Sequence, residues 1–175
     1  MNLIISALWF LLPAYFANMA PVFANALLKN NGKPIDFGKN IFGNHKTYRG
    51  LISGILFAIL VIYIQRYLAN INFFNEISIL DYSKINLLLY GFLLGFGTMF
   101  GDLIKSFFKR RLSIKPGSIF IPFDQIDYVI GAYLFLAIIY FPGWKFFGVS
   151  LVISFFGNLI INQFGYLLKI REKRW

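Results

Sequence analysis

The chain has 175 residues, of which 58% are apolar and 20% aromatic, and its net charge is +10. Soluble domains are usually about 45–50% apolar, so this composition favours an integral membrane protein over a soluble one. The absence of cysteine excludes thiol chemistry, disulfides and Cys-ligated zinc. A single histidine, His45, excludes a His-rich metal site.

Five apolar segments resemble membrane-spanning helices, which need roughly 20 mostly apolar residues. In chain order they cover residues 3–24, 51–68, 85–104, 125–141 and 146–168. The fourth is short unless it begins near Pro122. No internal repeat or low-complexity segment divides the chain. We therefore predict an all-α integral membrane protein with about five transmembrane helices, forming a single domain over residues 1–175.

The positive charges gather in alternate connections between these segments. Of the 17 Lys and Arg residues, 14 lie in residues 25–50, in residues 105–122 or after residue 168. Because cations are retained on the cytoplasmic side of a membrane, we expect these three regions in the cytoplasm. The N-terminus is then outside and the C-terminus inside. Nucleic-acid binding would require positive charge spread over a soluble face, whereas here it gathers in the connections between apolar segments and at the C-terminus. No nucleic-acid partner is therefore expected.

The first basic connection ends with Lys46, Thr47 and Arg49, just before the second apolar segment. Two cations and a hydroxyl at a helix start, where backbone N–H groups are exposed, suit a phosphate. The alternative is a juxtamembrane basic anchor that contacts lipid head groups. Composition alone supports both interpretations equally.

The second basic connection also carries carboxylates. If the third helix continues beyond its apolar part, Asp102, Ser106 and Lys109 lie on one face, and Arg110 borders it. An Asp, a hydroxyl and cations in a row suit a metal-bound triphosphate. The alternative is a local interaction of Asp102 with Ser106 or Lys105 that only solvates the helix end.

Asp124 and Asp127 lie three residues apart at the start of the fourth segment. In one interpretation Asp124 caps the helix and Asp127 lies in its first turn, where the helix dipole favours negative charge. A cap needs only one carboxylate, however, and Asp102 adds a third. Carboxylates at the edge of an apolar environment need a metal, a phosphate or each other as partner. Oxygen ligands suit Mg²⁺, so we predict a magnesium site of Asp102, Asp124 and Asp127.

These residues resemble the signature of integral-membrane CTP:phosphatidate cytidylyltransferases. The matching residues are Gly101-Asp102-Leu103, Ser106, Lys109-Arg110, Lys115 and Asp124-Gln125-Ile126-Asp127. Pro116 stands where that signature has an Asp, and the chain is short with five spans rather than about eight. These departures match the archaeal branch, the CDP-archaeol synthases. The segment from Gly43 to Gly50, the Pro34-Ile35-Asp36 turn and the Phe123-Asp124-Gln125-x-Asp127 element are similar to that family.

The resemblance implies a five-helix membrane domain with a charged cavity that faces the cytoplasm. It implies transfer of CMP from CTP to an isoprenoid-ether glycerol phosphate, which gives CDP-archaeol and pyrophosphate and requires Mg²⁺. We expect Asp102, Asp124 and Asp127 to act as metal ligands and catalytic residues, with Lys109 as a catalytic cation. The residues expected to bind substrate are Lys46, Thr47, Arg49, Ser106, Arg110 and, at the cytosine base, Gln125.

Three other readings of the sequence stay open. The same chemistry on an ester lipid would make the chain a CDP-diacylglycerol synthase that acts on phosphatidic acid. A small transporter would place charges near the middle of its spans, whereas 51–65 and 85–101 carry none. A basic scaffold that binds anionic lipid explains the cations but leaves the three carboxylates unused.

Overall fold

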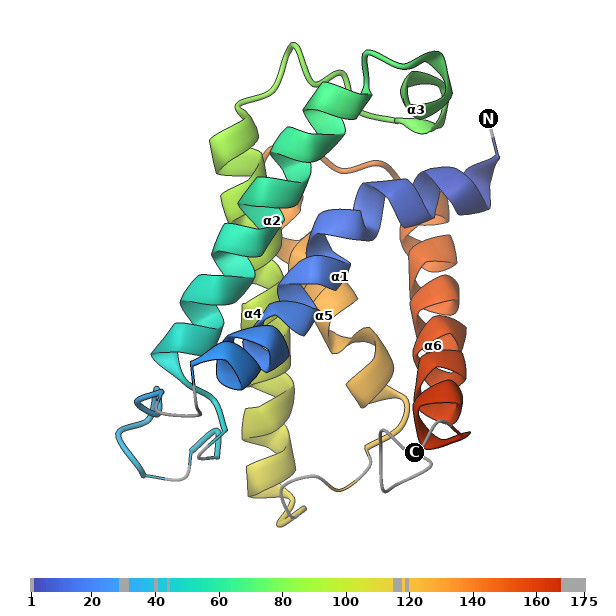
Figure 1. The fold of residues 1–175 in the computed structure, drawn as a ribbon. Coiled ribbons are helices and arrows are strands. Elements are labelled where there is room, and N and C mark those ends of the chain that lie inside the picture. Colours follow the sequence, from blue (N-terminus) through green and yellow to red (C-terminus); the bar gives the residue numbers. More distant parts are fainter. Residues whose placement is uncertain are drawn as a thin grey trace.

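The computed structural model describes residues 2–28, 32–39, 41–43, 45–114, 118 and 120–167. Within these ranges the chain is all-α, as predicted, and its extended backbone pairs only at an isolated bridge between Pro34 and Thr47. The helices are α1 (Leu3–Leu27), α2 (Tyr48–Leu68), α3 (Asn72–Ile77), α4 (Leu87–Arg111), α5 (Phe123–Leu136) and α6 (Trp144–Leu167) (Figure 1).

Helices form at all five predicted apolar segments, but the fourth is shorter than expected. Helices α1, α2, α4 and α6 are each long and apolar enough to cross a membrane. Helix α5 has 14 residues, about 21 Å at a rise of 1.5 Å per residue. It lies inside the bundle, where Val129, Ala132 and Leu136 are fully buried. Non-helical backbone at membrane depth is tolerated where protein covers it. The short helix α5 therefore need not cross the membrane by itself, because the non-helical residues next to it can complete the crossing.

The connections between helices alternate between the two ends of the bundle (Figure 1). The α1–α2 connection, the α4–α5 connection and the C-terminal end of α6 lie at one end. The N-terminus, α3 and the α5–α6 connection lie at the other. The two basic connections therefore share one end of the molecule. Lys29, Lys115, Pro116 and the cations after residue 168 fall outside the described residues.

Glycines bring the backbones of α4 and α5 into direct contact. A Cβ atom on Gly131 of α5 would lie 2.1 Å from the carbonyl oxygen of Gly97 on α4. A Cβ atom on Gly101 of α4 would lie 2.2 Å from the carbonyl oxygen of Asp127 on α5. No side chain fits at either position, since ordinary contacts of a Cβ atom begin at 3.4 Å. This close approach places the charged end of α4 against the first turns of α5.

Candidate active site

The described part of the connection before α2 is folded by its own backbone. Ile35 donates its N–H to the carbonyl oxygen of Lys46 at 2.8 Å, beside the bridge between Pro34 and Thr47. The two ends of the loop are thereby held side by side. Lys46 is held in place by this backbone pairing, and its side chain reaches α4, where it forms an ion pair with Asp102.

Asp36 organises the turn within this loop. Its buried carboxylate accepts hydrogen bonds from the N–H groups of Gly38 at 3.1 Å and Phe42 at 3.0 Å. Burial raises the pKa of Asp36, but the backbone donors together outweigh it and hold the pKa below its usual value. Asp36 is therefore a structural carboxylate, separate from the three at the start of α5 and the end of α4.

The start of α2 uses two of the predicted phosphate-binding residues for other contacts. Thr47 is the N-cap, and its Oγ1 accepts the N–H of Gly50 at 3.1 Å. Arg49 donates to Asn25 Oδ1 at 2.7 Å and to the carbonyl oxygen of Leu28 at 3.2 Å. Arg49 thus joins the end of α1 to the start of α2, and among the described ion pairs it has none with the three carboxylates.

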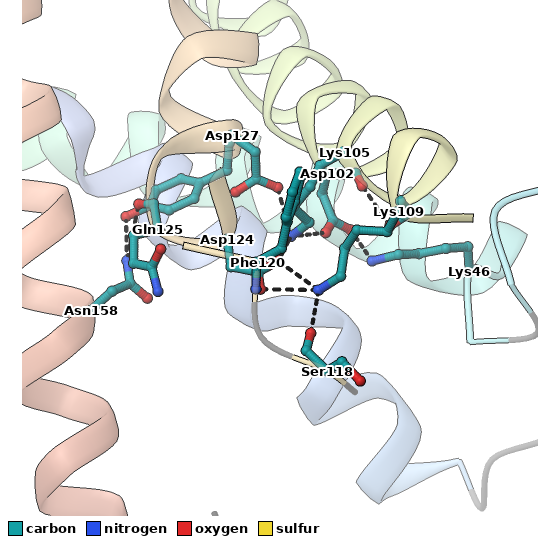
Figure 2. Close-up of polar contacts among 12 residues, drawn as sticks. Lys46, Asp102, Lys105, Lys109, Ser118, Phe120, Asp124, Gln125, Asp127 and Asn158 are labelled. Atoms are coloured by element: carbon teal, nitrogen blue, oxygen red, sulfur yellow. Dashed lines mark hydrogen bonds and ion pairs between the residues drawn. The ribbon is translucent and has the colours of Figure 1, made fainter. Parts of the chain in front are cut away.

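The three predicted carboxylates converge on a single ammonium group, that of Lys105 (Figure 2). Lys105 Nζ lies 3.1 Å from Asp102, 3.4 Å from Asp124 and 2.9 Å from Asp127. The Lys105 side chain is 14% exposed and that of Asp127 is 6% exposed. Helix α4 thus contributes one carboxylate and the central cation, whereas α5 contributes the other two carboxylates.

Lys109, one turn further along α4, holds Asp124 from the other side. Its Nζ lies 3.0 Å from both oxygens of Asp124 and donates to the carbonyl oxygen of Ser118 at 2.6 Å. Asp124 also accepts the N–H of Phe120 at 2.7 Å. Helix α5 begins after Pro122, which makes no side-chain cap. The N-cap interpretation of Asp124 is therefore wrong: this carboxylate folds back toward the loop and Lys109.

Ser106 and Gln125 make contacts of a different kind. The hydroxyl of Ser106 donates to the backbone carbonyl of Asp102 at 2.8 Å, as is common one helical turn apart. Gln125 is buried, and Asn158 of α6 donates to its backbone carbonyl at 3.4 Å and to Tyr128 Oη at 3.0 Å (Figure 2). Gln125 Oε1 is buried without a hydrogen-bond partner among the described residues.

A polar cavity and an apolar groove share Lys105 in their linings. A polar cavity of about 170 Å³ is lined by His45, Lys46, Lys105, Ser106, Lys109, Arg110 and Asp124, with Phe42 and Gly43 at its wall. Arg110 Nε is buried there without a hydrogen-bond partner in the described chain. An apolar groove of about 580 Å³ runs along α4 and α5 between side chains such as Phe100, Phe108 and Leu134, and Lys105 and Asp127 are the charged residues in its lining.

The oxygen donors at this site match those that Mg²⁺ uses in proteins. Within the described ranges, no three His, Asp, Glu or Cys side chains are grouped closely enough to hold a metal ion by themselves. Asp102, Asp124 and Asp127 instead surround the ammonium of Lys105. A cation is thus already bound at the centre of these carboxylates, so the donor set fits a cation, and in this structure a lysine takes that place.

The structure brings together most of the predicted site. The gathered residues are Lys46, Asp102, Ser106, Lys109, Arg110, Asp124 and Asp127. Thr47, Arg49 and Gln125 are used for a cap, a helix–helix contact and a buried position beside α6. Sequence reasoning missed Lys105 as a site residue, although its spacing of three from Asp102 was the signal that could have identified it.

Comparison with known proteins identifies the family. A family model described as CarS-like, CDP-archaeol synthase, matches residues 1–175. A CDP-archaeol synthase of Methanocaldococcus jannaschii is 36% identical, with 99% of this chain and 98% of the relative covered. One of Archaeoglobus fulgidus is 34% identical, with 100% of this chain and 99% of the relative covered. The chain belongs to the CDP-archaeol synthase family.

A solved structure supports the fold independently. It is described as an intramembrane enzyme for archaeal membrane lipid biosynthesis, and it superposes with a TM-score of 0.71 at 24% identity. The match covers 89% of this chain and 92% of that chain. Family membership confirms the expectation drawn from the motifs, an enzyme of membrane lipid biosynthesis that forms CDP-archaeol. The chain is a multi-pass membrane protein.

Proposed function

We propose that the whole chain is one cytidylyltransferase domain and that its polar cavity binds the phosphates of CTP. The observation that carries this proposal is the convergence of three carboxylates and three lysines in one cluster of ion pairs, of which Asp124 and all three lysines line the polar cavity. Lys46 and Lys109 approach from different elements, and Arg110 adds a guanidinium Nε that lacks a hydrogen-bond partner. Charge-assisted hydrogen bonds of this kind are the usual means of holding phosphate groups.

The acceptor lipid reaches the same place from the side in this proposal. The groove along α4 and α5 is lined by large apolar side chains, with Lys105 and Asp127 as its charged residues. Isoprenoid chains in the groove would allow the lipid phosphate to lie beside these two residues. The two substrates would then meet at Lys105, which lines both the groove and the polar cavity.

The reaction needs positioning and charge neutralisation more than proton transfer. An oxygen of the lipid phosphate, already an anion, attacks the α-phosphorus of CTP and forms a new P–O bond. The bond between the α-phosphorus and its bridging oxygen breaks, and pyrophosphate leaves. Lys46, Lys109 and Arg110 hold the phosphates in line and neutralise the charge that develops.

Asp102, Asp124 and Asp127 would hold the divalent cation in this scheme. When bound, Mg²⁺ supplies charge neutralisation on the CTP phosphates. Thr47 and Ser106 are the proposed hydroxyl partners, Arg49 the proposed second cation of the first loop, and Gln125 the proposed base contact. The roles of Thr47 and Arg49 require rearrangement from the contacts that their side chains make here. Gln125 Oε1 is buried without a hydrogen-bond partner among the described residues, so it must become accessible to reach the base.

We also propose that the charged end of the bundle faces the cytoplasm, where CTP is available. The basic connections gather at this end (Figure 1), which agrees with retention of cations inside. The N-terminus then lies outside and the C-terminus inside. Labelling of single cysteines introduced at Ser78 and Phe37 with an impermeant thiol reagent, in intact cells, tests the orientation. Only position 78 should be labelled, and labelling of position 37 alone would reverse the assignment.

The experiment that tests the proposed function offers the purified protein CTP, Mg²⁺ and one of two lipid phosphates. We expect CMP transfer to the isoprenoid-ether glycerol phosphate, with one pyrophosphate released for each lipid product. Preference for phosphatidic acid would favour the ester-lipid alternative. Absence of product with either lipid would favour a scaffold or transporter and refute the proposal.

A further inference from the structure

Lys105 differs from the other lysines of the site in how many carboxylates it contacts. Lys46 pairs with Asp102 and Lys109 pairs with Asp124, whereas Lys105 pairs with both of these carboxylates and with Asp127. Its contacts with Asp102, Asp124 and Asp127 join α4 to α5 through one nitrogen atom. Lys105 therefore occupies the point at which all three oxygen donors can be reached.

Lys105 is also the residue shared by the linings of the two cavities. It lines the polar cavity together with Lys46, Lys109 and Asp124. It lines the apolar groove together with Asp127 and the aromatic side chains of α4. Its ammonium therefore stands between the space proposed for the CTP phosphates and the space proposed for the lipid.

The charges of the cluster are balanced as they stand. Three carboxylates, of Asp102, Asp124 and Asp127, face the three ammonium groups of Lys46, Lys105 and Lys109. A divalent cation placed among the same oxygens would lie within a few ångströms of Lys105 Nζ, and two positive charges so close repel strongly. A metal ion and Lys105 therefore compete for the three carboxylates. The flexible four-carbon stem of lysine allows its ammonium group to move away.

We propose that Lys105 acts as an internal cation that holds the carboxylates in the substrate-free enzyme and is displaced when metal-bound CTP enters. The displaced ammonium then binds the acceptor phosphate in the groove, beside Asp127. This inference rests on the proposed function, because it assigns the incoming cation and the phosphates to the same site. It gives the enzyme a preformed site without a bound metal and couples metal entry to capture of the lipid phosphate.

The first test measures Mn²⁺ binding to purified protein in the absence of CTP, by electron paramagnetic resonance. We expect Lys105→Met to lower the Kd for Mn²⁺ about tenfold or more, because the competing charge is gone. Lys84→Met is the matched control, and its Kd should equal that of the wild type. Lys84 pairs with Asp81 in the connection between α3 and α4, and that connection lies at the opposite end of the bundle (Figure 1). An unchanged or raised Kd in Lys105→Met would overturn the proposal.

The second test uses the wild-type protein, so it does not depend on folding of a variant. Acylation of Lys105 by a small amine-reactive reagent is quantified by mass spectrometry with and without Mn²⁺ and CTP. We expect labelling of Lys105 to rise severalfold with metal and nucleotide, while labelling of Lys84 stays constant. Labelling of Lys105 that stays constant or falls would contradict displacement.

Kinetics test the contact with the acceptor. We expect Lys105→Met to lower kcat/KM for the lipid phosphate about 100-fold while KM for CTP changes less than threefold. If KM for CTP rose by as much as kcat/KM for the lipid phosphate fell, Lys105 could not be assigned to the acceptor. If the wild type transfers no CMP at all, the proposed function fails, whereas the Mn²⁺ competition is still measured. The two failures are therefore distinguishable.

Discussion

The contact between α4 and α5 gives the sharpest structural prediction, because Gly131 leaves no room for a side chain. In Gly131→Ala the new Cβ atom would lie 2.1 Å from the carbonyl oxygen of Gly97, against 3.4 Å for the closest ordinary contact. The helices must therefore separate by about 1.3 Å. Overpacking of this kind costs about 1–3 kcal/mol of stability. A misplacement of about 1 Å at an active site costs roughly 100-fold in rate.

We expect Gly131→Ala to fold with a lowered Tm in detergent and to lose about 100-fold in CTP-dependent pyrophosphate release. The shift moves Asp124 and Asp127 away from Lys105, so the activity should fall further than the stability alone implies. Gly148→Ala on α6 is the matched control, since an added Cβ there meets no atom within 4 Å. Wild-type activity in Gly131→Ala would refute the claim that close helix packing positions the carboxylates.

Three further predictions concern single side chains around the site. Lys109→Met should lower Tm and reduce turnover about 100-fold or more, because it leaves Asp124 without its closest cation; thermal melting and pyrophosphate release measure both effects. Thr47→Ala should cost about 1 kcal/mol through loss of the α2 cap, whereas Thr47→Ser should retain it, and denaturant titration compares them. The pKa of Asp36 is lowered by folding, so its contribution to stability is complete above its unfolded pKa of about 3.9 and is lost as pH falls through the folded value. Hydrogen exchange of residues 36–43 should show lower protection, relative to the intrinsic rate at the same pH, in wild type at low pH and in Asp36→Asn at pH 7. Equal protection in both proteins at pH 7 would contradict this role of Asp36.

The apolar segments could be predicted because a helix in a membrane satisfies its own backbone, so length and hydropathy reveal it. Their ends could not be predicted from hydropathy alone. Helix α4 continues to Arg111, well beyond the expected residue 104, because its charged last turns find partners on α5. Helix α5 ends at Leu136 because burial within the bundle, which a single segment does not reveal, removes the need for a full span.

The composition of the site was predictable, but its pairings were not. The sequence pattern indicates a cluster of carboxylates and cations from two connections, and the structure brings Asp102, Asp124 and Asp127 together. Arg49 has the right charge and position along the chain, yet its partners are on α1, which no local spacing could reveal. Lys105 was read only as a local partner of Asp102, because its contacts with α5 depend on how closely the two helices approach.

Transfer of label to lipid from CTP labelled at its α-phosphorus, compared between wild type and Asp127→Asn, shows whether these carboxylates serve catalysis. We expect Mg²⁺-dependent labelling of the isoprenoid-ether lipid by the wild type. We expect a loss of about 100-fold or more in the variant, with helical content and gel-filtration elution like those of the wild type. Wild-type labelling by folded Asp127→Asn would contradict the assignment of these carboxylates to catalysis.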